Sequence, residues 1–176
     1  MPATTIALIG YRGTGKTITA QLVALRLGYE WVDADVEIEL ALGMSITDFF
    51  AESGEERFRE VESQVVVELC KRQRTVLALG GGAVLREENR QRLADCGAVV
   101  WLKASPATIE RRIAHDPNSV GRRPNLTNHG GRNEIEALLD QREPIYRSCA
   151  TLEVDTEDRD PADIADEIVA ALEPAG

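Results

Sequence analysis

The chain has 176 residues, of which 43% are hydrophobic and 28% charged, so it can bury a substantial core in a globular fold. Its formal net charge of −10 argues against nucleic-acid or membrane-surface binding, because both require a basic face. No apolar run approaches the length of a membrane span and no signal-peptide pattern is visible, so we expect a cytoplasmic protein.

Strand-like and helical patterns alternate along the chain. Strands are expected at residues 5–9, 30–32, 75–79, 98–102 and 151–154. This alternation predicts an α/β protein, with a five-stranded parallel sheet in a three-layer α/β/α arrangement and one domain over residues 1–176. Trp31 and Trp101 fall inside strands and are expected in the core.

A glycine-rich loop follows the first expected strand. Residues 10–17 read Gly-Tyr-Arg-Gly-Thr-Gly-Lys-Thr and fit the P-loop pattern G-x-x-x-x-G-K-[ST]. A helix is expected over residues 17–27, with Ile18, Leu22 and Leu25 on one face. Strand, glycine loop and helix in this order are the context the pattern requires. The sequence therefore predicts a P-loop NTPase fold that binds a nucleoside triphosphate.

The residues at the fixed positions of that pattern each have a chemical role. The backbone N–H groups of Gly13, Thr14 and Gly15 are expected to cradle phosphate at the helix N-terminus. Lys16 is expected to reach the β- and γ-phosphates, and the Thr17 hydroxyl to bind Mg²⁺. The alternative is a glycine-rich turn that a lysine follows by chance.

Two aspartates follow the second expected strand. Asp33 and Asp35 lie at its carboxyl end, where open α/β sheets bind ligands. Side chains two apart on an extended chain point the same way, so both carboxylates can face one cleft. One carboxylate near Mg²⁺ and one near an attacking hydroxyl suit phosphoryl transfer to an alcohol. A pair of helix-capping aspartates is the alternative.

The next interval has helical character and no strand. A helix start is expected at Ser45, and one long helix over residues 55–74. An insertion over about residues 36–74 beside a P-loop can form a platform for a second substrate.

Three glycines follow the third expected strand. Gly80, Gly81 and Gly82 stand where many P-loop proteins carry a magnesium-binding aspartate, which points to Asp33 as its replacement. Glycine leaves backbone N–H groups open to a ligand, so an acceptor site is expected here. A tight left-handed turn is the alternative.

Arginines supply the positive charge that an anion site needs in so acidic a chain. The candidates are Arg59 in the insertion, Arg123 in a loop over residues 116–131, and Arg142 at a helix end before Pro144. The Gly-, Pro- and Asn-rich loop is expected to be a mobile lid that closes over phosphoryl transfer.

With these motifs in place, the sequence resembles the shikimate kinases, small P-loop kinases related to the nucleoside monophosphate kinases. The resemblance runs nearly end to end. It includes the P-loop, Asp33-Ala34-Asp35, residues 54–62 and 80–84, Arg123-Pro124, residues 142–146 and residues 154–156.

The resemblance implies ATP-dependent phosphorylation of the 3-hydroxyl of shikimate, with Mg²⁺, by a monomeric enzyme. It implies that Asp35 holds the acceptor hydroxyls, that Thr17 and Asp33 act on Mg²⁺, and that Lys16 and Arg123 stabilise the transferring phosphoryl group. Shikimate would bind to Arg59, Gly81, Gly82 and Arg142, with Glu62 steadying Arg59, and ATP would also contact Arg112 and Pro161. The lid departs from the family pattern, since Asn125 follows Arg123-Pro124 and Arg122 duplicates the basic position.

Other functions remain open on the sequence alone. A kinase for gluconate or a nucleoside monophosphate would share the P-loop and the lid. A nucleotide-gated switch is disfavoured because no N-K-x-D motif is present. A catalytically silent ATP-binding paralogue would not need Lys16, Thr17, Asp33, Asp35 and Arg123 together.

Overall fold

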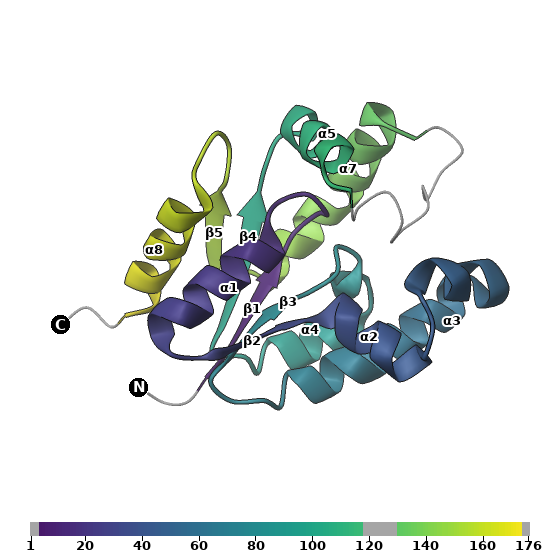
Figure 1. The fold of residues 1–176 in the computed structure, drawn as a ribbon, viewed down its shortest axis with the longest axis horizontal. Coiled ribbons are helices and arrows are strands. Elements are labelled where there is room, and N and C mark those ends of the chain that lie inside the picture. The colour runs from purple at the N-terminus through teal and green to yellow at the C-terminus, as the bar shows by residue number, and fades with distance from the viewer. Residues whose placement is uncertain (1–3, 118–129, 174–176) are drawn as a thin grey trace.

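The computed structural model describes residues 4–117 and 130–173. At its centre lies a parallel sheet of five strands in the order β2-β3-β1-β4-β5 (Figure 1). The strands are β1 (Thr5–Ile9), β2 (Glu30–Asp33), β3 (Thr75–Ala78), β4 (Ala98–Lys103) and β5 (Leu152–Asp155). All five predicted strands are present, and their ends differ from the prediction by at most one residue.

Helices cover both faces of the sheet, so the predicted three-layer α/β/α fold is confirmed (Figure 1). α1 and α8 pack on one face, and α3, α4 and α7 pack on the other. The helices are α1 (Lys16–Leu27), α2 (Ala34–Leu42), α3 (Ile46–Leu69), α4 (Glu87–Leu93), α5 (Pro106–His115), α7 (Arg132–Cys149) and α8 (Pro161–Leu172), with a 3₁₀ turn η1 (Ala83–Leu85). None of the helices in the described ranges is long and apolar enough to cross a membrane.

The apolar face predicted for α1 is only partly buried, because Leu22 packs against the core but Ile18 and Leu25 do not. Its buried residues are the small side chains Thr19, Ala20, Val23 and Ala24, whereas Ile18 and Leu25 are exposed. Small side chains let the helix lie close to the sheet and to α8, and the face that carries Ile18 and Leu25 is directed toward solvent.

The prediction for Trp101 is confirmed and that for Trp31 is wrong. Trp101 lies in β4, inside the sheet, and is 2% exposed. Trp31 lies in β2, which forms an edge of the sheet, and is 42% exposed. An edge strand has a neighbour on one side only, so its side chains are less covered.

The interval after β2 contains α2 and α3, which pack on each other around Ile38, Ile46 and Phe58. The predicted start is confirmed, because Ser45 caps α3 by accepting a hydrogen bond from the Asp48 N–H. The helix expected over residues 55–74 starts as predicted, because Gly54 (φ 79°) breaks α3 just before residue 55. It ends at Leu69, five residues earlier than predicted, since the following residues turn back into β3.

The helix expected to end before Pro144 continues through it to Cys149. Proline removes one helical N–H donor, but burial of Leu139, Arg142 and Tyr146 holds the helix on both sides of it. As a result, Arg142 and Tyr146 lie one turn apart on the same buried face of α7.

Candidate functional site

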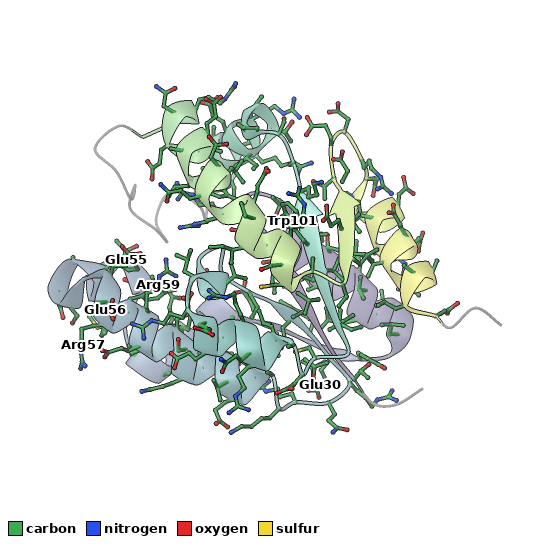
Figure 2. The ribbon with its side chains drawn as sticks, turned by 180° about the vertical axis from the view of Figure 1, so that it is seen from behind. Glu30, Glu55, Glu56, Arg57, Arg59 and Trp101 are labelled. Carbon is green, nitrogen blue, oxygen red and sulfur yellow. The ribbon has the colours of Figure 1, made fainter. Side chains whose placement is uncertain are left out.

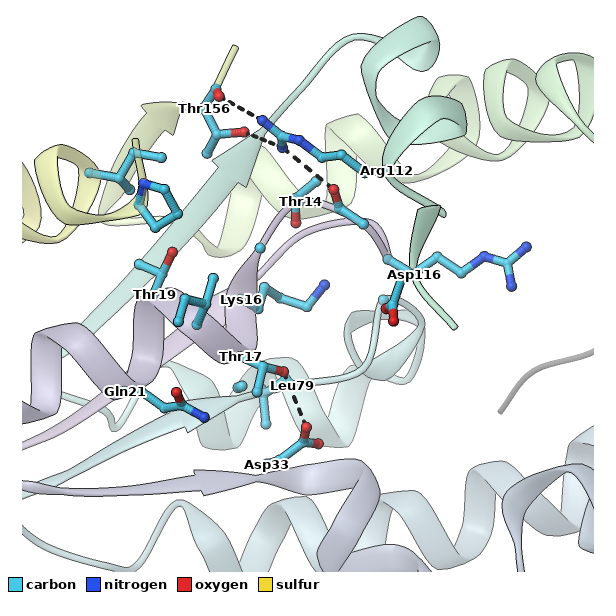
Figure 3. A pocket seen from close by; sticks show the side chains of 18 of the residues that line it. Thr14, Lys16, Thr17, Thr19, Gln21, Asp33, Leu79, Arg112, Asp116 and Thr156 are labelled. Atoms are coloured by element: carbon cyan, nitrogen blue, oxygen red, sulfur yellow. Dashed lines mark hydrogen bonds between the residues drawn. The ribbon is translucent and has the colours of Figure 1, made fainter. Parts of the chain in front are cut away.

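A cleft of about 620 Å³ lies at the carboxyl ends of the central strands, beside the P-loop (Figure 3). Parallel α/β sheets bind ligands at this edge. The predicted nucleotide and metal residues that line it are Gly13, Thr14, Gly15, Lys16, Thr17, Asp33, Arg112 and Pro161. From the acceptor set, Asp35 and Gly81 line the same cleft.

The P-loop presents its helix N-terminus to this cleft. Gly15 is the N-cap of α1 in the left-handed conformation, and no side chain caps the first turn. The Nζ of Lys16 donates to the carbonyls of Gly10 and Tyr11, each at 2.8 Å, and the side chain points into the cavity (Figure 3). Uncapped N–H groups and an ammonium group around one hollow make an anion site of phosphate size.

Thr17 and Asp33 meet across the cleft. The Thr17 hydroxyl donates to Asp33 Oδ2 at 3.1 Å (Figure 3). These two hard oxygen donors fit Mg²⁺, which is commonly held by few protein groups together with substrate phosphates. The described residues contain no cluster of three or more His, Cys, Asp or Glu side chains that could hold a metal ion.

The expectation that Asp33 and Asp35 both extend from a strand is wrong, although both line the cleft. Asp33 ends β2, and its Oδ1 caps α2 by accepting from the Asp35 N–H at 2.9 Å. Asp35 lies in the first turn of α2. The alternative of a helix-capping aspartate therefore holds for Asp33 Oδ1. The other carboxylate oxygen, Oδ2, accepts from Thr17.

Cations concentrate at the cleft, and two of them, Lys16 and Arg112, are among those the sequence indicated. Arg12, Lys16, Arg112 and Arg159 line it. Arg112 is held against the loop after β5 by hydrogen bonds to Thr156 Oγ1 (3.0 Å) and Thr156 O (2.8 Å) (Figure 3). Sequence reasoning assigned no role to Arg12 or Arg159. Arg12 could have been found from its place inside the P-loop, whereas Arg159 has no comparable local pattern.

Arg59 does not line the cleft but lies beside Gly80, Gly81 and Gly82, which we call the glycine segment. Its side chain is buried, and Nη1 donates to Glu62 Oε1 at 2.7 Å. The contact between Arg59 and Glu62, expected from the resemblance, is therefore present. Arg59 Nε and Glu62 Oε2 have no protein partner. A buried ion pair with unused polar atoms is costly, which favours a further polar ligand at this point.

Gly82 leaves the space that Arg59 occupies. A Cβ atom at Gly82 would lie 2.5 Å from Arg59 Nη1 and 2.6 Å from its Cζ. Neither Gly80, Gly81 nor Gly82 has a positive φ, so the left-handed-turn alternative does not explain them. Close approach of a guanidinium group does explain Gly82.

Arg142 reaches the same segment from α7. It is 5% exposed, and its Nη1 would lie 3.5 Å from a Cβ atom at Gly81. Its guanidinium group also lies 5.7 Å above the ring of Tyr11, in the P-loop. Burial raises the pKa of the Tyr11 phenol, and the charges of Arg12 and Arg142 oppose that shift. The two predicted arginines, one from α3 and one from α7, thus converge on Gly81 and Gly82.

The predicted lid falls largely outside the described residues, and with it Arg122, Arg123 and Asn125. At its edges, Asp116 lines the cleft and Gly131 precedes α7.

Comparison with known proteins gives a consistent result. A protein-family model described as shikimate kinase matches residues 12–173. The chain is 41% identical over 164 residues to a shikimate kinase from Rhodopirellula baltica, which covers 93% of this chain and 88% of the relative. It superposes on shikimate kinase from Acinetobacter baumannii in complex with shikimate, with a TM-score of 0.90 and 34% identity over 97% of this chain and 93% of the other. A gluconokinase from Sinorhizobium meliloti 1021 shares the fold alone, with a TM-score of 0.64 and 20% identity over 97% of this chain and 91% of the other.

Proposed function

Because this chain belongs to the shikimate kinase family, we propose that its cleft transfers the γ-phosphoryl group of ATP to the 3-hydroxyl of shikimate. The activity is ATP-dependent phosphorylation of shikimate in aromatic amino acid biosynthesis, and the family uses Mg²⁺ with ATP. Kinases for gluconate or nucleoside monophosphates are not favoured, since the gluconokinase likeness extends to the fold alone.

The reaction needs one bond formed and one broken. The 3-hydroxyl oxygen bonds to the γ-phosphorus as the bond from that phosphorus to the bridging oxygen of ADP breaks. Asp35, in the first turn of α2, orients the hydroxyl and accepts its proton. Lys16 and the amides of the P-loop bind the β- and γ-phosphates, and Arg123 adds positive charge as the phosphoryl group transfers.

Thr17 and Asp33 are the residues that would hold Mg²⁺. When bound, the ion neutralises part of the phosphate charge. Arg112 and Pro161, which both line the cleft, would hold the nucleoside part of ATP.

One observation carries the choice of acceptor. Two buried guanidinium groups, Arg59 and Arg142, converge on Gly81 and Gly82 at the edge of the phosphate cleft. Such a pair suits a small carboxylic acid, because a guanidinium group binds a carboxylate through two parallel hydrogen bonds. In this arrangement the arginines bind the shikimate carboxylate while the amides of Gly81 and Gly82 contact the ring hydroxyls.

The test is an ADP-release assay with shikimate, quinate, gluconate and AMP as separate acceptors. We expect rapid ADP release with shikimate and at most weak release with gluconate or AMP. Robust release with AMP alone would overturn the proposal.

Three further expectations stay predictions. We propose that residues 1–176 form one domain with an acceptor-binding insertion over about residues 36–74 and a lid over about residues 116–131. We also propose that the protein is a cytoplasmic monomer and that it has no nucleic-acid partner. The net charge of −10 supports the absence of nucleic-acid binding. Light scattering coupled to gel filtration, with and without added DNA, tests the monomer and the absence of nucleic-acid binding.

A further inference from the structure

Tyr146 connects α7 to the backbone of the glycine segment. Its hydroxyl donates to the carbonyl of Gly81 at 2.5 Å. The side chain is fully buried, and its ring lies 5.6 Å from that of Trp101 in β4. The donor therefore comes from a residue whose ring is fixed by packing in the core, 65 positions away along the chain.

Neighbouring carbonyls of the same segment have other partners. The Gly80 and Gly82 carbonyls accept backbone N–H groups of the turn, from Ala83 and Leu85. The Ala83 carbonyl accepts from Asn89 Nδ2 at 2.8 Å. Among these carbonyls, that of Gly81 receives no backbone hydrogen bond from the turn in the described part of the chain. Tyr146 supplies its hydrogen bond instead.

That hydrogen bond has a geometric consequence for the acceptor side. A peptide unit is planar, so fixing the direction of the Gly81 carbonyl also fixes the direction of the Gly82 N–H. The same peptide lies against Arg59, because a Cβ at Gly82 would overlap its guanidinium group. Tyr146 also lies one helical turn from Arg142 on α7, so one helix face delivers the arginine and orients the glycines.

We propose that Tyr146 is a positioning residue for shikimate, acting through the Gly81–Gly82 peptide to fix how the acceptor meets Arg59 and Arg142. This inference rests on the proposed function. Tyr146 touches no substrate in this arrangement, and its effect passes through the hydrogen bond to Gly81.

A purely structural role for Tyr146 makes a different prediction. Loss of a buried hydrogen bond lowers thermal stability whether or not the bond positions a substrate. The two roles separate in the Michaelis constants, because positioning affects shikimate and leaves ATP, which binds at the P-loop, unaffected.

The experiment compares wild type with Tyr146→Phe, which removes one oxygen atom and keeps the ring. Tyr29→Phe is the matched control, since Tyr29 lies before β2 with its ring against Arg74, away from the glycine segment. We expect Tyr146→Phe to raise the shikimate KM roughly three- to tenfold, the effect of one hydrogen bond, with the ATP KM changed less than about twofold. Tyr29→Phe should leave both constants unchanged.

An unchanged shikimate KM in Tyr146→Phe, or equal rises in both KM values, would overturn the inference. The proposed function would still stand if the wild type turns over shikimate normally. Absence of shikimate turnover by the wild type would instead defeat the proposed function. If Tyr146→Phe does not fold, 4-fluorophenylalanine at position 146 fills the space of the hydroxyl but cannot donate a hydrogen bond to Gly81. Its shikimate KM should rise with little change in the ATP KM, and an unchanged shikimate KM would overturn the inference.

Discussion

The phosphate side and the acceptor side of the cleft are built in different ways. The phosphate side consists of one contiguous loop, residues 10–17, whose backbone amides and single lysine need only the local strand–loop–helix conformation. The acceptor side consists of side chains from α3 and α7 that meet at glycines after β3. Its geometry exists only after distant elements have packed together.

This difference explains where specificity lies. A backbone cradle recognises phosphate and accepts any triphosphate that reaches it. A buried guanidinium pair demands a carboxylate of the right size and position, because a wrong ligand leaves buried charges unsatisfied. Substitutions on the acceptor side should therefore mainly weaken shikimate binding. Substitutions on the phosphate side should mainly slow phosphoryl transfer.

The largest expected effect is on the chemical step. Asp35→Asn removes the group that orients and deprotonates the acceptor, and kcat should fall at least ~10²-fold. Asp48→Asn is the matched control, because Asp48 occupies the first turn of α3 but is exposed outside the cleft. Near-normal kcat in Asp35→Asn, measured by steady-state ADP release, would rule out the role of Asp35.

The next effect tests the carboxylate contact. Arg59→Lys keeps a positive charge beside Glu62 but loses the two-pronged donor, so the shikimate KM should rise roughly ten- to a hundredfold with little change in the ATP KM. Arg57→Lys, on the exposed side of the same helix (Figure 2), should change neither value. Equal rises in both KM values would show that Arg59 supports the fold and not shikimate.

A smaller effect tests the close approach at the glycines. Gly82→Ala places a methyl group against Arg59 and should raise the shikimate KM about tenfold. In an Arg59→Ala background the same substitution should cost much less, since the clashing group is gone. Additive effects in this double-mutant cycle would mean that Gly82 acts independently of Arg59.

The smallest effect concerns the pH dependence of stability in the loop after β5, whose Thr156 holds Arg112 at the cleft. Glu157 accepts hydrogen bonds from the Ser105 N–H at 3.0 Å and from Thr108, and these bonds lower its pKa below the ordinary 4.5. A lowered pKa adds stability that is present above 4.5 and is lost as the pH falls through the folded-state value.

Melting temperatures across acid pH test this. The advantage of wild type over Glu157→Gln should be complete near neutral pH and shrink below about 4.5. Glu136→Gln, exposed on α7, is the control and should show no such trend. A pH-independent difference would mean that the Glu157 charge does not matter.

The sequence predicts the phosphate side better than the acceptor side for the same physical reason. Residues 10–17 and all five strands follow from local patterns. The buried face of α1 does not, because the packing of small residues against α8 outweighs the periodicity of Ile18 and Leu25. The path of α7 through Pro144 and the hydrogen bond from Tyr146 to Gly81 depend on contacts between distant segments, which no local pattern encodes.

The most direct test of this two-sided account is a crystal structure with shikimate and a non-hydrolysable ATP analogue. We predict phosphates on the P-loop amides, the shikimate carboxylate in hydrogen-bond contact with both Arg59 and Arg142, and the 3-hydroxyl beside Asp35. A shikimate carboxylate bound away from both arginines would contradict the account.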